Sequence, residues 1–120
     1  MNVRKRSGKV VPFDPGFISR AISLAAAAAG EHDEEAAARI TEAVTEKLRS
    51  RKEEIWDIET IQDTVEETLF EHKAYQTAKA YIRYRLEKEK ERRIKLNNRI
   101  EILERRIQEE DSAEVNEMVR

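Results

Sequence analysis

Neither glycine nor proline occurs after Gly30 in this 120-residue chain. Both residues commonly end or interrupt helices, so their absence from the rest of the chain predicts a body made almost entirely of helices. The last helix is expected to begin near Ala74, and because no stop signal follows, it should extend past Arg99. Extended backbone is therefore expected only near the N-terminus.

The N-terminal segment, residues 3–14, is predicted to form a β-hairpin. Val3 and the Val10–Val11 pair favour extended backbone, and Ser7–Gly8 between them suits a tight reversal. A two-stranded hairpin alone is marginally stable in water, so we expect it to lie across the helices as a lid.

Capping residues and apolar periodicity predict four helices. Asp14 and Asp33 are expected to cap the first two helices, and Gly30 ends the first one. A third helix is expected to begin at Asp57. The apolar positions that recur at helical spacing include Ile22 and Ala25, then Ile40, Val44 and Leu48, then Ile61, Val65 and Leu69. We therefore predict an α+β, mostly α fold: an N-terminal β-hairpin cap on a four-helix bundle, with an extended C-terminal helix.

The extended helix carries an apolar stripe of its own. Leu96, Ile100, Leu103 and Ile107 are spaced by four, three and four residues, which is typical of a short coiled-coil seam. Such a helix needs a partner surface, and the expected partner is either a second copy of the chain, which would make these four residues an oligomerisation site, or a domain that has been cut away. We divide the chain into a globular domain at 1–92, a helical extension at 93–110 and a polar tail at 111–120.

Composition argues against several classes of function. The chain has no cysteine, only two histidines (His32 and His72), and no glycine-rich phosphate loop, so neither a metal site nor a catalytic group is indicated. A net charge of −2 does not favour general nucleic-acid binding. No signal sequence or apolar run of spanning length is present, which fits a cytoplasmic protein without a membrane partner.

Two groups of cations are candidates for anion binding. Lys5 and Arg6 flank the expected turn, where backbone N–H groups are also exposed, a setting suited to a polyphosphate. On the fourth helix, residues 79–85 interleave two tyrosines with Lys79, Arg83 and Arg85. That pattern fits equally a helix surface with half-buried tyrosines and solvated cations.

Four segments in order and spacing carry a resemblance to a known family. They are Val3-Arg4-Lys5-Arg6-Ser7-Gly8, Val11-Pro12-Phe13-Asp14, Ile61-Gln62-Asp63-Thr64-Val65-Glu66 and Ala78-Lys79-Ala80-Tyr81-Ile82-Arg83-Tyr84-Arg85. Together they resemble the ATP-cone domain, a regulatory nucleotide-binding module of ribonucleotide reductases that also occurs in a transcriptional repressor of reductase genes. The similarity covers roughly residues 2–92 and is greatest to the anaerobic, glycyl-radical reductases.

The resemblance implies a site for ATP or dATP, with magnesium accompanying the nucleotide. Lys5 and Arg6 would contact the phosphates, Val3 and Ile22 would lie near the adenine, and Gln62 would lie near the base or ribose. The other residues that the resemblance assigns to the nucleotide are Ser7 and Gly8 in the turn, and Lys79, Arg83 and Arg85 on the last helix.

Two positions depart from the family pattern. Ser7 replaces the usual turn aspartate, a mild change because serine also stabilises turns. Phe17 stands where members commonly have a lysine or arginine aimed at phosphate. One cation fewer could weaken triphosphate binding by about 1–3 kcal/mol.

The resulting hypothesis is a non-catalytic, allosteric domain in which ATP or dATP alters self-association and so sets the activity of a reductase catalytic domain. The alternatives are a degenerate cone that has lost its ligand, an oligomerisation module that needs no nucleotide, and part of a DNA-binding transcriptional regulator. No zinc-ribbon cysteines or evident recognition helix accompany the last of these.

Overall fold

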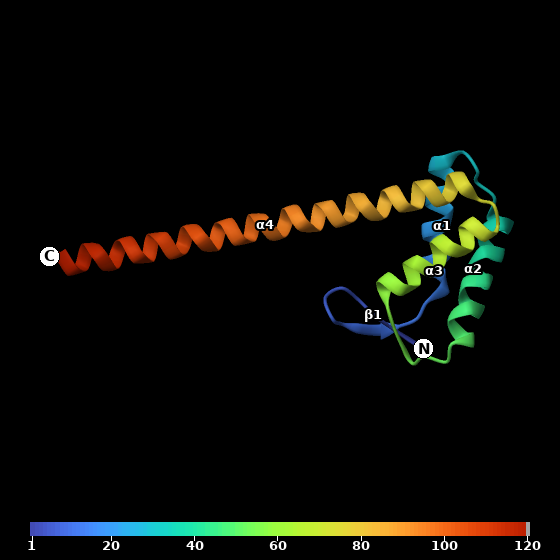
Figure 1. The fold of residues 1–120 in the computed structure, drawn as a ribbon, viewed down its shortest axis with the longest axis horizontal. Coiled ribbons are helices and arrows are strands. Elements are labelled where there is room, and N and C mark those ends of the chain that lie inside the picture. Colours follow the sequence, from blue (N-terminus) through green and yellow to red (C-terminus); the bar gives the residue numbers. More distant parts are fainter. Residues whose placement is uncertain (120) are drawn as a thin grey trace. The chain divides into compact units, whose positions relative to one another are not determined.

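The computed structural model describes the backbone of residues 1–119 and the side chains of residues 1–112. Along the chain come β1 (Asn2–Arg4), β2 (Val10–Pro12), α1 (Pro15–Ala29), α2 (Glu34–Ser50), β3 (Ile55–Asp57), α3 (Ile58–Glu71) and α4 (Tyr75–Val119) (Figure 1). The predicted α+β, mostly helical class is confirmed. Residues 1–84 and 85–120 form two compact units.

A small sheet begins the first unit. β1 pairs antiparallel with β2, as the predicted hairpin requires, and Gly8 takes a positive φ of 89° in the turn between them. The Lys5 N–H donates to the Lys9 carbonyl at 2.8 Å, and the Gly8 N–H donates to the Lys5 carbonyl at 2.9 Å. These two bonds close the reversal.

The sheet has a third strand that the sequence did not predict. β3 pairs in parallel with β1, with Val3 opposite Trp56 and Arg4 opposite Asp57, so the strand order is β2-β1-β3. The expectation that extended backbone is confined to residues 3–14 was therefore wrong. A three-residue strand is too short to show alternation, and its pairing with a segment over fifty positions earlier leaves no local pattern.

The predicted helix caps are present. Asp14 accepts a hydrogen bond from the Gly16 N–H at 2.9 Å, and Asp33 accepts from the Glu35 N–H at 3.0 Å. Asp57 occupies the N-cap position of α3 without a side-chain capping bond. Its carboxylate instead accepts from Arg4 on the neighbouring strand.

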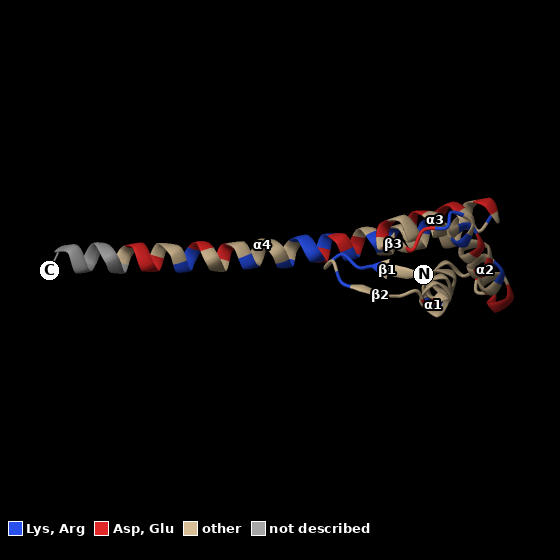
Figure 2. Cartoon of the chain, turned by 90° about the horizontal axis from the view of Figure 1, so that it is seen from below, with Lys and Arg blue, Asp and Glu red and all other residues tan. Residues whose placement is uncertain are grey.

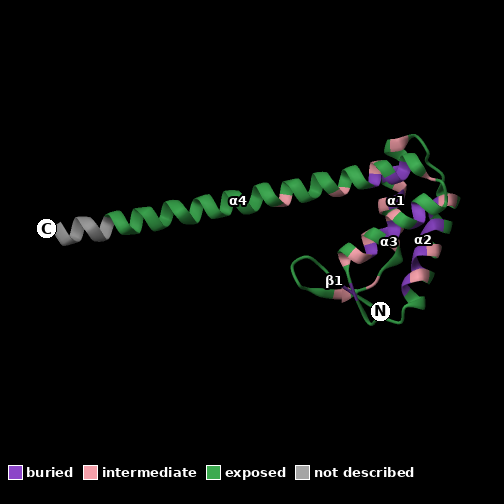
Figure 3. Cartoon of the chain, in the orientation of Figure 1, coloured by how far each residue is buried: buried purple, intermediate pink, exposed green. Residues whose placement is uncertain are grey.

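One core joins the sheet to all four helices within the first unit. Val3 and Trp56 come from the sheet, and the most deeply buried aliphatic side chains are Ile22, Val44, Leu48, Val65 and Leu69. Figure 3 shows this burial along α1, α2 and α3. Ala25, Ala37 and Ala78 are also buried, which allows close approach of helix backbones in a core with few large side chains.

The second unit is the continuation of α4 from Arg85. The backbone of the predicted polar tail, 111–120, is helical to Val119, and Arg120 lies outside the described residues. No helix among the described residues combines the length and apolar character needed to cross a membrane.

Candidate functional site

The β1–β2 turn carries a cluster of cations. In β1, the alternation of side chains along the strand buries Val3 in the core and leaves its neighbours exposed. The chain between β1 and β2 carries Lys5, Arg6 and Lys9, and it is blue in Figure 2. All three side chains belong to exposed residues. The turn therefore presents a compact positive surface at the edge of the sheet.

Two of the arginines are anchored to the segment that begins α3. Arg4 Nη1 lies 3.1 Å from Asp57 Oδ1, a pairing set by the parallel register of β1 and β3. Arg6 Nη2 donates to Gln62 Oε1 at 2.9 Å, and Arg6 Nε lies 3.8 Å from Glu59 Oε1. These contacts hold the turn close to the first turns of α3.

A basic pocket of about 390 Å³ lies between the turn and the start of α3. Its lining combines three cations of the hairpin with the first turn of the helix, whose free N–H groups and dipole favour anions. Two carboxylates offset part of that positive charge. The lining residues are Arg4, Lys5, Arg6, Gly8, Asp57, Ile58, Glu59 and Thr60.

An apolar pocket of about 620 Å³ lies beneath the hairpin. Strand, loop and helix side chains form its walls, and most of them are hydrocarbon. The lining residues are Val3, Lys5, Val11, Pro12, Phe13, Asp14, Phe17, Ile18, Ile58 and Ile61. Lys5 and Ile58 border both pockets, so the basic and apolar pockets adjoin.

The structure brings together about half of the residues that the sequence predicts for a nucleotide site. Val3 and Lys5 line the apolar pocket, Lys5, Arg6 and Gly8 line the basic one, and Gln62 is hydrogen-bonded to Arg6. Ser7 stays in the turn, where its Oγ accepts from the Lys9 N–H at 3.4 Å.

The other predicted residues lie elsewhere. Ile22 is 1% exposed and packs in the core, so in this structure its side chain offers almost no surface to a ligand. Lys79 and Arg83 are exposed on α4 and are absent from the linings of the two adjoining pockets. Arg85 belongs to the second unit.

Sequence reasoning missed most of the apolar lining. Phe13, Ile18 and Ile58 line the pocket, and the sequence assigned none of them to the site. The sequence offers one indication of this lining. Apolar residues near a hairpin rich in cations are expected either to fill the core or to form the wall of a pocket. Phe17 stands where the family pattern has a cation, and its ring lines the pocket, with the Arg20 guanidinium 4.6 Å from the ring centroid.

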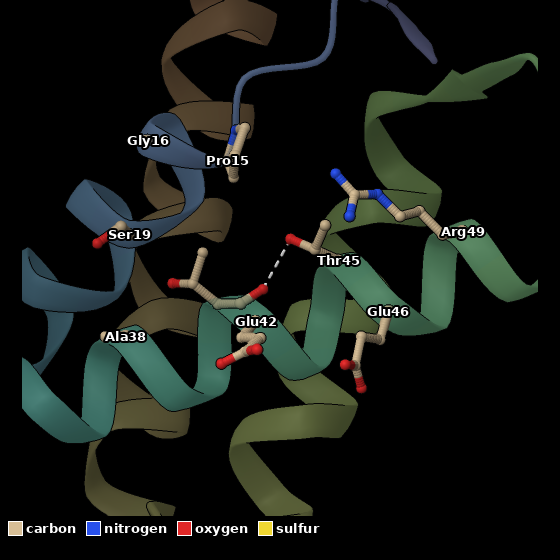
Figure 4. Close-up of a pocket in the computed structure, with 9 residues that line it drawn as sticks. Pro15, Gly16, Ser19, Ala38, Glu42, Thr45, Glu46 and Arg49 are labelled. Carbon is tan, nitrogen blue, oxygen red and sulfur yellow. Dashed lines mark hydrogen bonds between the residues drawn. The ribbon is translucent and has the colours of Figure 1, made fainter.

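A third pocket, of about 420 Å³, lies between the start of α1 and α2 (Figure 4). Glu42, Glu46 and Arg49 give it mixed charge, and Thr45 Oγ donates to the Thr41 carbonyl at 2.8 Å. None of the predicted site residues lines it. Among the described residues, no group of three or more histidines or carboxylates is placed to hold a metal ion.

Comparison with known proteins identifies the family. The family model described as "ATP cone domain" matches residues 1–90. This chain belongs to the ATP-cone family. The resemblance inferred from the four motifs is thereby confirmed, and the matched range covers the sheet, α1 to α3 and the start of α4.

Two relatives place this ATP cone near one group of enzymes. It is 37% identical over 118 residues to the anaerobic ribonucleoside-triphosphate reductase of Salmonella typhimurium strain LT2, and 39% identical over 101 residues to that of Escherichia coli K12. The alignments cover 97% and 82% of this chain but only 16% and 14% of the two reductases. The chain thus corresponds to a small part of such an enzyme.

Proposed function

We propose that this chain is the allosteric adenine-nucleotide-binding domain of an anaerobic ribonucleotide reductase, located in the cytoplasm, and that it has no catalytic role of its own. ATP and dATP would be the regulatory ligands. Membership of the ATP-cone family and similarity to two reductases support the general role. Binding of ATP or dATP would change the self-association of the domain and so set the activity of the reductase.

The observation that carries the proposal is that Lys5 borders both adjoining pockets. An adenosine polyphosphate also has an apolar, aromatic end and an anionic end. We place the adenine beneath the hairpin beside Val3, and the phosphates against Lys5, Arg6 and the backbone N–H groups around Ser7 and Gly8. Magnesium would arrive with the nucleotide, held by its phosphates.

Arg6 supplies a route from binding to conformation. In this structure its guanidinium faces Gln62 and Glu59 on α3. A phosphate would bind the Arg6 guanidinium more strongly than Glu59 does at 3.8 Å. Nucleotide binding would therefore replace the Arg6–Glu59 contact by an Arg6–phosphate contact, and the hairpin would be held to α3 differently. Gln62 would be left beside the ribose or base.

Discrimination between ATP and dATP has to arise at the ribose, because the two ligands differ only in the 2′-hydroxyl. A ligand shifts an equilibrium only by its difference in affinity for the two states. We therefore assign that difference to the surroundings of Gln62, with Lys79 and Arg83 completing the anion site in one of the states.

Thermal unfolding of the 120-residue chain with ATP, dATP and GTP tests the site. At about 100 times the Kd, a ligand stabilises by about 2.7 kcal/mol, which raises Tm by on the order of 10 °C in a domain of this size. We expect such shifts with ATP and dATP, and smaller ones with GTP.

Lys5→Ala with Arg6→Ala should abolish these shifts. Lys9→Ala is the matched control, since Lys9 is an exposed cation of the same turn that lines neither pocket, and it should behave as the parent does. Absence of any shift in the parent at millimolar nucleotide would favour a cone that has lost its ligand.

A further inference from the structure

The second unit exposes a stripe of large aliphatic side chains. Leu96, Ile100, Leu103 and Ile107 are 56%, 47%, 57% and 58% exposed. Their spacing puts them on one face of α4. A helix with such a stripe gains most of its stability by packing the stripe against another surface.

The residue types on this stripe indicate a particular partner geometry. If Ile100 and Ile107 take the a positions of a heptad, Leu96 and Leu103 take the d positions. A β-branched residue at a with leucine at d favours a coiled coil of two parallel helices over higher oligomers. Arg93 and Glu89, at the preceding a and d positions, limit the stripe on its N-terminal side.

The charges that flank the stripe indicate the same geometry. Arg99 and Arg106 occupy g positions, and Glu104 and Asp111 occupy e positions. In a parallel, in-register pair, Arg99 faces Glu104 of the second copy, and Arg106 faces Asp111 of the second copy. An antiparallel pair would instead bring arginine to arginine and carboxylate to carboxylate, which is unfavourable.

We propose that residues 96–111 pair with the same residues of a second copy of this chain as a parallel, in-register, two-stranded coiled coil. The inference deepens the self-association in the proposed function and rests on that function for its regulatory meaning. The pairing itself requires no nucleotide. Because the seam is only about two heptads long, association should be weak and should grow with concentration.

Sedimentation equilibrium without nucleotide tests the pairing. Over about 10 µM to 1 mM, the parent mass should rise from 14.0 kDa toward twice that value. Ile100→Asp should hold the mass at the monomer value throughout. Ile102→Asp is the matched control: Ile102 is 49% exposed on the same helix but lies off the stripe, and its variant should associate as the parent does.

A parent that remains monomeric over the whole range, or equal loss in both aspartate variants, would overturn the proposal. Circular dichroism establishes that both variants stay helical. Thermal shifts with ATP should be the same in Ile100→Asp and the parent, so failure of pairing and failure of nucleotide binding are distinguishable.

Charge reversal tests the register. Arg99→Glu with Arg106→Glu should weaken association about tenfold or more, because every flanking pair becomes repulsive. Adding Glu104→Arg and Asp111→Arg to that variant should restore association. Failure of the fourfold variant to recover would contradict the parallel arrangement.

A single thiol tests the orientation independently, since the chain has no cysteine. Ile107→Cys should oxidise readily to a disulfide-linked dimer in the parallel pair, where both copies of position 107 meet. In an antiparallel pair, position 107 would face position 96, and the dimer would not form. That result would overturn the proposed orientation.

Discussion

Phe17 borders the apolar pocket with 67% of its surface exposed, and the Arg20 guanidinium lies over its ring. The ring can stack on an adenine, and Arg20 provides a cation one helical turn from where the family pattern has one. Arg20 therefore keeps a positive charge beside Phe17, which is partly offset by Asp14, whose Oδ2 lies 4.0 Å from Arg20 Nη2.

Phe17→Ala should weaken ATP binding about tenfold, because it removes a ring of the apolar pocket in which we place the adenine, and base–aromatic stacking contributes about 1–3 kcal/mol. Equilibrium titration of the variant and the parent measures the change. Leu24→Ala is the control, since it shortens an exposed apolar side chain of α1 that borders neither adjoining pocket. Equal weakening in both variants would indicate a general effect on the domain, and no weakening at Phe17 would place the adenine elsewhere.

Single residues also show where sequence reasoning reached its limit. Lys5 and Arg6 were predictable as candidates for anion binding, because two cations beside a turn lie close to exposed backbone N–H groups. That they bind an anion stays a prediction. The contact from Arg6 to Gln62 was not predictable from spacing, since it joins residues 56 positions apart. It depends on β3 bringing the start of α3 beside the hairpin.

At the scale of elements, helix ends were predictable because each is encoded locally. Asp14, Asp33 and Gly30 act within three or four residues of their own position. β3 was not predictable, because its identity as a strand comes from pairing with β1. Trp56 within it fills the core at 5% exposed, although among the described residues its indole N–H has no hydrogen-bond partner.

The contact between α2 and α3 includes an ion pair whose contribution to stability depends on pH. Lys47 Nζ lies 2.7 Å from Glu71 Oε2 and also donates to Thr68 Oγ1 at 3.1 Å. The hydrogen bond from Lys47 is the main reason that the pKa of Glu71 is lowered from its usual value of 4.5. A carboxyl whose pKa is lower in the folded state stabilises the fold when ionised.

Glu71→Gln should therefore destabilise the domain above pH 4.5, and the difference from the parent should fade as pH drops through the lowered pKa. Urea unfolding at about pH 7 and about pH 3 measures the difference in the free energy of unfolding between the variant and the parent. We expect that difference to be small at the higher pH, because the ion pair is half-exposed. Glu53→Gln, which removes a carboxylate from a loop, is the comparison. A difference that grows toward low pH would contradict the assignment.

At the scale of the whole molecule, the sequence was sufficient for the fold class, the four helices and the family, because periodicity, caps and ordered motifs are all local or collinear. The residues that line the pockets were harder to predict from the sequence. Val3, Phe17 and Ile61 come from three separate elements, and their spacing does not indicate that they line one pocket. Ile22 was expected both on the apolar stripe of α1 and near the adenine. It is buried in the core, and its contact with a ligand stays a prediction.

The central claim is that an adenine nucleotide binds beneath the hairpin of this ATP cone. Isothermal titration of ATP, and separately of dATP, into the 120-residue chain tests it most directly. We predict saturable heat with both nucleotides, and a loss of that heat in the variant carrying Lys5→Ala and Arg6→Ala. No saturable heat with either nucleotide at millimolar concentration would contradict the claim.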